Sequence, residues 1–212
     1  MGEVCKDKLM LDLCGRPAVS YAIEAYATAK NIAYIVIVTR KELISTYQEL
    51  LQKYGHGISS IVVEGGAERT ESVLNGVHSV PEKYSHVAIA DGARPLIRTD
   101  DIDKTIEAAY NVGAAALGSF MIDTVKKVRS GRIIKTIPRA DLALIQTPQV
   151  FEREEYLICA TAASKLQHEF TDDASIYEFF GKEVAFVEGH RDNLKITVPE
   201  DIAIFQALME ER

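Results

Sequence analysis

The stretch HVAIADGARPLI, residues 86–97, decides the fold that this sequence predicts. Its first five residues form a nearly continuous apolar run, which is typical of a strand buried on both faces of a sheet. The run ends at Asp91 and Gly92, a carboxylate and a turn-forming glycine. In open α/β sheets, ligands bind beyond the carboxyl ends of the strands. The stretch therefore predicts a buried strand that delivers Asp91 to a ligand-binding edge.

Strand-like and helix-like segments alternate on both sides of this stretch. Further strands are predicted over residues 33–38, 58–63, 114–120 and 184–187, with an edge strand over residues 194–197. Helices are predicted over residues 17–32, 41–54, 68–80, 152–166, 173–180 and 200–209. One more helix ends at Tyr110, and we expect Asp100 or Asp101 to cap its start. The alternation predicts the α/β class, with a mostly parallel sheet flanked by helices.

The alternation is interrupted between residues 123 and 146. Two short β-like pieces, residues 124–128 and 132–137, flank Gly131 and carry several lysines and arginines. We interpret this segment as a β-ribbon that projects from the sheet. The rest of the chain has no internal repeat, low-complexity tract or linker, so the sequence predicts one domain over residues 1–212 with this arm inserted.

The composition limits the classes of protein to consider. The chain has 212 residues, of which 47% are hydrophobic and 26% charged, which indicates a globular protein. Its formal net charge of −7 argues against a nucleic-acid binder. The apolar stretches are too short for a membrane span, and no secretory signal opens the chain. Cys5, Cys14 and Cys159 lie far apart, so we expect reduced thiols and a cytoplasmic location.

Several catalytic motifs are absent from the sequence. It contains no G-x-x-x-x-G-K-[ST], no G-x-G-x-x-G, no G-x-S-x-G and no H-E-x-x-H. Its five histidines have no spacing typical of metal ligands. The sequence therefore disfavours a P-loop ATPase, a lipase-type hydrolase and a zinc protease.

Polar residues gather where predicted strands end. The sequences GGAER (65–69) and DGARP (91–95) each follow a strand, and DNLK (192–195) leads into the predicted edge strand. A carboxylate, two arginines, a lysine and glycine-rich backbone are suited to binding Mg²⁺ and phosphate groups. The sequence thus predicts a site for a phosphorylated ligand at this edge of the sheet.

Six blocks of this sequence resemble one enzyme family, in the right order. IADGARPLI (89–97) resembles the H-D-G-A-R-P motif of the 2-C-methyl-D-erythritol 4-phosphate cytidylyltransferases. The other five blocks are KLMLDLCGRPAVSYAI (8–23), GGAERTESVLNG (65–76), LIQTPQVF (144–151), TDDAS (171–175) and DNLKITVPEDI (192–202). Each block alone is a weak signal, but six in order are a specific one.

The resemblance implies a single-domain, Rossmann-like nucleotidyltransferase fold and a reaction. CTP and 2-C-methyl-D-erythritol 4-phosphate give the cytidine diphosphate derivative and pyrophosphate, with Mg²⁺. The acceptor phosphate attacks the α-phosphorus of CTP in line, so catalysis consists of positioning and charge neutralisation. A homodimer is also implied, because the family's arm reaches across a two-fold axis into the neighbouring acceptor site.

The resemblance assigns the nucleotide side of the site. Asp91 resembles the carboxylate that holds Mg²⁺, and Lys8 and Lys195 resemble lysines that contact the reacting phosphates. Further contacts to the nucleotide are expected from Gly66, Ser72, Gly92 and Arg94. A purely structural role remains possible for each of these residues. The aspartate and the glycines could simply form turns, and the serine could be a polar residue at a helix start. The lysines could be solvated or protect a sheet edge, and the arginine could form a structural salt bridge.

The acceptor side is assigned to the arm and its surroundings. Thr124 and Arg139 resemble the family's contacts to the acceptor phosphate, and Thr147 and Thr171 resemble polar contacts nearby. Lys195 is expected to reach the acceptor as well. The arm's charges also fit a solvated hairpin, and residues 171–173 also fit a helix N-cap.

The sequence departs from the family pattern in four places. The family begins with a strand and a glycine-rich loop ending in Arg-Met-Gly, whereas this sequence begins just after that point. The resemblance therefore predicts an apolar slot in the sheet where that strand would lie. Ala90 replaces a histidine, Ala67 an acidic residue and Ile122 a lysine.

Three other functions remain open at this stage. The first is a cytidylyltransferase for a pentitol phosphate such as ribitol 5-phosphate, which the changes at Ile122 and Ala90 favour. The second is a catalytically inactive nucleotide-binding homologue. The third and broadest is a sugar-nucleotide pyrophosphorylase that uses another base.

Overall fold

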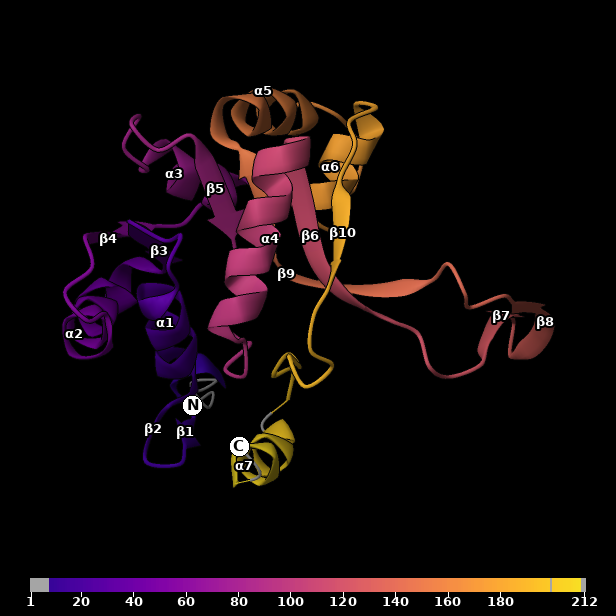
Figure 1. Ribbon diagram of the computed structural model, residues 1–212, viewed down its shortest axis with the longest axis horizontal. Coiled ribbons are helices and arrows are strands. Elements are labelled where there is room, and N and C mark those ends of the chain that lie inside the picture. The colour runs from indigo at the N-terminus through magenta and orange to yellow at the C-terminus, as the bar shows by residue number, and fades with distance from the viewer. Residues whose placement is uncertain (1–7, 199, 211–212) are drawn as a thin grey trace, which may run out of the picture.

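The computed structural model describes residues 8–198 and 200–210; Cys5 lies outside them. A four-stranded sheet forms the centre of the molecule, with its strands in the order β10-β6-β9-β5 (Figure 1). They are β5 (His86–Ile89), β6 (Ala114–Phe120), β9 (Ala143–Glu152) and β10 (Ala185–Glu188). β10 runs parallel to β6, whereas β9 runs antiparallel to both β6 and β5.

Three two-stranded pairings accompany this sheet in the described part of the chain. β3 (Ile35–Thr39) and β4 (Ser60–Glu64) are parallel, and two antiparallel hairpins are β1 (Asp12–Leu13) with β2 (Arg16–Pro17) and β7 (Val125–Arg129) with β8 (Arg132–Ile137). Except for the edge strand, each strand predicted in the body of the fold coincides with an observed strand to within two residues at either end. The predicted α/β class is confirmed.

Helices pack on both faces of the central sheet. They are α1 (Ala18–Thr28), α2 (Ile44–Tyr54), α3 (Arg69–His78), α4 (Thr99–Val112), α5 (Arg153–Ala163), α6 (Asp173–Phe179) and α7 (Asp201–Glu210), with 3-10 turns over Lys8–Met10 and Lys41–Leu43. Figure 1 shows α4 in front of the sheet. Successive side chains of β9 point to opposite faces, so Val150 packs with α4 while Phe151 packs with α5 and α6. Two apolar layers therefore share one strand.

The sequence analysis does not predict strand β9, because its middle is polar and contains a proline. Three of its polar residues are nevertheless buried: Gln146, Thr147 and Gln149. The Gln149 side-chain oxygen accepts a hydrogen bond from the backbone N–H of Ala174 at 2.8 Å. The Thr147 hydroxyl accepts one from the backbone N–H of Asp91 at 3.0 Å. Because these polar groups have partners, they can be buried at little cost.

Two local predictions are wrong. Residues 194–197 form an irregular loop rather than an edge strand, and the Ile196 N–H donates to the Ala93 carbonyl at 2.8 Å. Helix α4 has Arg98 at its N-cap position, so neither Asp100 nor Asp101 caps it. Both aspartates lie in the first helical turn, where negative charge is favourable because of the helix dipole.

The predicted N-cap of α6 is confirmed. The Asp172 side chain accepts from the Ser175 backbone N–H at 3.0 Å, and the Ser175 side chain bonds back to Asp172 as a capping box. This arrangement satisfies backbone groups that a helix start otherwise leaves unpaired.

A cavity of about 980 Å³ lies between β3 and β5. Each of these strands pairs along one edge only, β3 with β4 and β5 with β9. Every residue of both strands lines the cavity, and since side chains alternate, the space lies between the strand edges rather than on one face. Apolar side chains of α1 and α3 line it as well, and charged residues such as Arg40, Arg69 and Asp91 also contribute. The cavity has the apolar character expected of the predicted slot.

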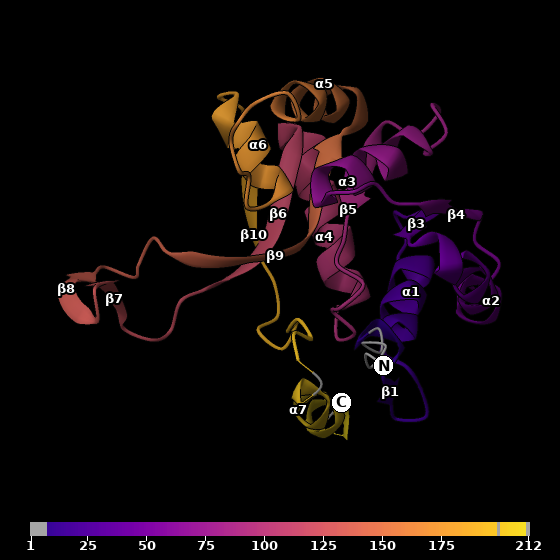
Figure 2. The same cartoon turned by 180° about the vertical axis from the view of Figure 1, so that it is seen from behind.

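Strands β7 and β8 form the predicted arm, which stands away from the central sheet (Figures 1 and 2). Its turn uses Ser130 and Gly131 with positive φ angles of 47° and 73°, which suits a tight hairpin. Val128, Ile133 and Ile134 are 58%, 68% and 55% exposed. The arm therefore presents apolar side chains outward.

Two further features bear on the cellular setting. None of the helices in residues 8–198 and 200–210 combines the length and hydropathy that a membrane crossing requires. Cys14 and Cys159 carry free thiols. Burial is the main cause that raises the pKa of the Cys159 thiol, so this thiol is a poor nucleophile near neutral pH.

An ion pair with a buried carboxylate joins α3 to α6. Arg69 donates to Asp173 Oδ2 at 2.5 Å, and the Asp173 side chain is 1% exposed. The Tyr156 hydroxyl donates to the other oxygen, Oδ1, at 2.6 Å. Desolvation alone would lower the pKa of Arg69, but the hydrogen bond and charge of Asp173 outweigh it and raise that pKa. Burial raises the pKa of Tyr156, so both donors keep their protons.

We expect Arg69→Met to destabilise the fold by about 1–3 kcal/mol, because it leaves a buried carboxylate oxygen without its cation. Urea unfolding at neutral pH measures this loss. Arg129→Met, at an exposed position of the arm, is the matched control and is expected to cost less than about 0.5 kcal/mol. Equal losses in the two variants would contradict the structural importance of this ion pair.

Candidate active site

Asp91 lies just beyond the carboxyl end of β5, as the sequence predicts. Its backbone N–H donates to the Thr147 hydroxyl at 3.0 Å, which fixes it against β9. Its side chain is 22% exposed and lines the cavity between β3 and β5. The carboxylate is therefore held firmly but remains accessible to a ligand.

Two cationic side chains converge on Asp91. Arg94 Nε lies 3.3 Å from Asp91 Oδ2, and Lys195 Nζ lies 3.1 Å from the same oxygen. Arg94 also donates through Nη1 to the Asn193 carbonyl at 2.8 Å, which links it to the segment carrying Lys195. Two positive charges face one negative charge here, so the cluster has a local surplus that suits a polyphosphate.

A glycine turn borders the same cavity. Gly65 N–H donates to the Thr39 carbonyl at 2.9 Å, and Gly66 N–H donates to the Ser72 hydroxyl at 3.0 Å. Gly66, Ser72 and Gly92 line the cavity together with Asp91. A Cβ atom at Gly66 would lie 2.2 Å from the Glu71 side chain, so the turn favours glycine. The structure thus brings together four residues that the resemblance assigns to the nucleotide.

Asn193 is a buried contact that the sequence analysis does not single out. Its side chain is fully buried, and Nδ2 donates to Gln146 Oε1 at 2.9 Å and to the Thr147 carbonyl at 3.2 Å. These bonds hold the loop of Lys195 against β9. The only sequence signal for this role is the position of Asn193 in the DNLK motif.

Tyr26 of α1 also lines the cavity, and it too lies outside the predicted site. Burial is the largest cause that raises the pKa of its hydroxyl, and the negative charge of Asp91 raises it further. The hydroxyl therefore stays protonated and can act as a neutral donor. A tyrosine in a predicted amphipathic helix gives no sequence signal of such a position.

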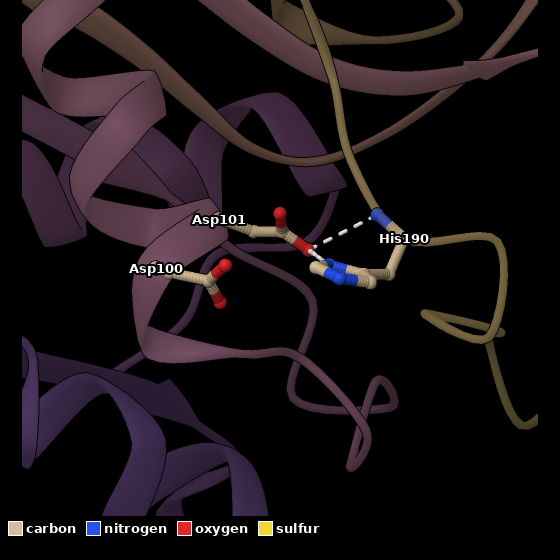
Figure 3. Close-up of side chains that lie close together, drawn as sticks. All are labelled: Asp100, Asp101 and His190. Atoms are coloured by element: carbon tan, nitrogen blue, oxygen red, sulfur yellow. Dashed lines mark hydrogen bonds and ion pairs between the residues drawn. The ribbon is translucent and has the colours of Figure 1, made fainter.

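The residues present fit a divalent cation at Asp91. Both ion pairs use Oδ2, and Oδ1 takes part in neither. Mg²⁺ prefers oxygen ligands and is held by one or two carboxylates together with phosphate oxygens and water. A different group, Asp100, Asp101 and His190, places candidate ligand atoms within 4.8 Å of one another (Figure 3). That group lies at the start of α4 and does not include Asp91.

In the described part of the chain, the other predicted residues take no part in the ion pairs and hydrogen bonds around Asp91. Lys8 is in the first 3-10 turn, and its charge adds to the stronger effect of hydrogen bonds from Thr197 and Val198 in lowering the pKa of Asp201. Thr124 and Arg139 flank the β7–β8 hairpin of the arm, and both are exposed. Thr171 is exposed beside the N-cap of α6.

Comparisons with known proteins identify the family of this chain. The family model of the 2-C-methyl-D-erythritol 4-phosphate cytidylyltransferases (IspD) matches residues 2–211. The chain is 37% identical over 205 residues to a protein of that name from Clostridium botulinum (strain Loch Maree / Type A3), covering 96% of this chain and 90% of the relative. It is 38% identical over 209 residues to one from Caldanaerobacter subterraneus subsp. tengcongensis, covering 97% and 91%.

Solved structures show the same fold. The crystal structure of 4-diphosphocytidyl-2C-methyl-D-erythritol synthase from Anaerococcus prevotii DSM 20548 matches with a TM-score of 0.88 at 27% identity, covering 94% of this chain and 88% of that one. The cytidylyltransferase of Thermus thermophilus matches with a TM-score of 0.80 at 26% identity, covering 96% and 94%. The predicted Rossmann-like fold is confirmed. The chain belongs to the 2-C-methyl-D-erythritol 4-phosphate cytidylyltransferase family.

Proposed function

We propose that this protein transfers the cytidylyl group of CTP to 2-C-methyl-D-erythritol 4-phosphate and releases pyrophosphate. The observation that carries the proposal is the meeting of Asp91, Arg94 and Lys195 at a cavity that Gly66 and Ser72 also line. Membership of the family supports the choice of substrates. Because CTP is a cytoplasmic metabolite, we place the enzyme in the cytoplasm.

The reaction needs no nucleophile from the protein. An oxygen of the acceptor's phosphate forms a bond to the α-phosphorus of CTP, and the bond from that phosphorus to the bridging oxygen of the β-phosphate breaks. Pyrophosphate leaves with the electron pair of that bond. The protein must therefore align three highly charged groups and neutralise them.

The side chains divide this task between them. Lys195 Nζ and the Arg94 guanidinium supply positive charge at the phosphates undergoing exchange, with Lys195, 43% exposed, the more accessible of the two. Gly66 and Ser72 are proposed to contact the cytidine, and Gly92 lets the backbone approach the nucleotide. Lys8 is proposed as a second phosphate lysine, since its neighbour Leu9 lines the same cavity.

Mg²⁺ is proposed as the cofactor. When bound, it neutralises the triphosphate and makes the α-phosphorus more electrophilic. Asp91 Oδ1 would hold it, while Oδ2 keeps Lys195 and Arg94 in place. Asp91 would thus position both the metal and the cations.

We expect Asp91→Ala to abolish Mg²⁺-dependent release of pyrophosphate from CTP and 2-C-methyl-D-erythritol 4-phosphate. The loss should exceed about a hundredfold, because one variant removes the metal ligand and the shared partner of two cations. A coupled pyrophosphate assay measures it, with far-UV circular dichroism to verify folding.

The control is Asp100→Ala, which removes the same charge from an exposed position and is expected to keep nearly full activity. Ribitol 5-phosphate serves as the comparison acceptor. Retention of more than about a tenth of the activity by Asp91→Ala would refute the metal assignment, since metal-site contacts contribute more than that. Preference for ribitol 5-phosphate would refute the acceptor.

The arm is proposed to complete the acceptor site of a second copy of the chain. Figures 1 and 2 show β7 and β8 standing off from the body, and Thr124 and Arg139 flank that hairpin. The exposed apolar residues of the arm would gain burial in such a contact. The proposed assembly is a homodimer in which Arg139 and Thr124 bind the acceptor phosphate of the partner, near Thr147, Thr171 and Lys195.

Mixing two impaired variants, assayed at an acceptor concentration well below the KM of the Arg139 variant, tests this shared site. Arg139→Ala is expected to raise KM for the acceptor far more than KM for CTP, whereas Arg129→Ala on the same arm changes neither.

Lys195→Ala should lower kcat. When the Arg139 and Lys195 variants are unfolded together and refolded as a mixture, mixed dimers regain one intact site, so about a quarter of wild-type activity should return. An unchanged sum of the two separate activities would place Arg139 in its own subunit's site.

A further inference from the structure

The loop of residues 189–197 is held at its start by β6, at Asn193 by β9, and at five points by residues 91–101. Gly189 N–H donates to the Gly118 carbonyl at 2.8 Å, where β10 ends beside β6. From there the loop crosses the segment between β5 and α4. Its fixed points there are the pairs His190 with Asp101, Asp192 with Arg98, Asn193 with Arg94, Lys195 with Asp91 and Ile196 with Ala93.

Asp101 forms the buried member of these contacts. Its side chain is 1% exposed, and its Oδ2 accepts from His190 Nδ1 at 2.8 Å and from the His190 backbone N–H at 3.1 Å (Figure 3). A carboxylate oxygen can only accept, so Nδ1 carries a proton. The other oxygen, Oδ1, is buried without a hydrogen-bond partner. Keeping a carboxylate in such a place costs free energy, which the two bonds from His190 must offset.

We propose that Asp101 is a positioning residue of the active site, acting through His190 on Lys195. The two bonds to one oxygen fix both the backbone and the ring of His190, so they fix the direction in which the loop leaves β10. Lys195 follows five positions later and must reach Asp91 Oδ2 from that direction. Neither Asp101 nor His190 is assigned a role in the transfer itself. The kinetic effect expected of this positioning rests on the proposed function.

The remaining anchors do not replace this one. The Arg98 side chain in its pair with Asp192 is 39% exposed, and exposed ion pairs contribute little. Arg94 is shared between Asp91 and Asn193, so it moves with the site. Asn193 and Ile196 also have buried partners, in Gln146, Thr147 and Ala93, but these bonds hold the loop beside Lys195. The pair of Asp101 with His190 holds the loop at a different point, one residue after Gly189, where it leaves β10.

The first test compares four variants in steady-state kinetics. Asp101→Asn and His190→Gln are expected to lower kcat on the order of tenfold while leaving KM for the acceptor unchanged. His190→Asn should retain most of the activity, because its amide can donate from the position of Nδ1. Asp100→Asn, one residue away and exposed, is the matched control for loss of charge and should behave as wild type. Equal losses in Asp100→Asn and Asp101→Asn would overturn the proposal.

A double-variant cycle tests whether the effect passes through Lys195. In the Lys195→Met background, Asp101→Asn should cause no further loss of kcat, because the group it positions is already gone. A second loss of similar size in that background would overturn the proposal, since it would mean that Asp101 acts by another route.

A labelling experiment needs no turnover and so separates this proposal from the proposed function. Limited reductive methylation, followed by mass spectrometry, reports how freely Lys195 reacts, with Lys165 as the internal reference. Asp101→Asn and His190→Gln should speed the labelling of Lys195 by about threefold, as expected when a partly exposed ion pair is loosened. Asp100→Asn and His190→Asn should not. If the wild-type protein transfers no cytidylyl group, the proposed function fails, but labelling still tests the positioning role. An unchanged rate of Lys195 labelling in Asp101→Asn and His190→Gln would overturn that role.

Discussion

Asp91 places a negative charge just beyond strand β5, and the candidate site depends on the pairing of that charge with Arg94 and Lys195. Lys195 comes from a loop more than a hundred positions later in the chain, and Arg94 comes from the turn that directly follows. The two cations would repel each other without the carboxylate between them. The carboxylate would in turn be costly at a partly buried strand end without the cations. Each of the three side chains is therefore stable in its place because of the other two.

The polar middle of β9 supports the cluster of Asp91, Arg94 and Lys195 through hydrogen bonds. The Thr147 hydroxyl holds the Asp91 backbone, and the Gln146 side chain and the Thr147 carbonyl hold Asn193. These groups lie in the centre of a sheet whose outer layers are apolar, Val150 on one side and Phe151 on the other. The apolar neighbours keep the strand buried, and the polar residues hold Asp91 and Asn193 at the candidate site. One strand thus serves stability and function in alternate stretches.

The sequence predicts the strands that carry the site better than the loops that complete it. Residues 86–97 suffice for β5 and for the position of Asp91, because a continuous apolar run followed by a polar turn has one common structural outcome. Strand β9 escapes prediction because Gln149 finds a partner in the first turn of α6 and Gln146 finds one in the loop of Asn193, and only the folded chain brings these near. The same limit explains the error at residues 194–197. The Ile196 backbone bonds to Ala93, which is distant in sequence. The two residues before this segment, Asp192 and Asn193, bond to the equally distant Arg98 and Arg94.

Lys195 can pair with Asp91 only late in the synthesis of each chain, because it lies near the end of the sequence. A ribosome makes β5, α4, β6 and β9 well before it makes residues 189–197. The growing chain can therefore assemble the apolar layers around β9 while Asp91, Asp101 and the partners of Asn193 still face water. Chains interrupted before that point would hold most of the core but none of the chemistry. Such non-local closure is slow compared with local folding. The candidate site is therefore completed only after the apolar layers around β9 can already form.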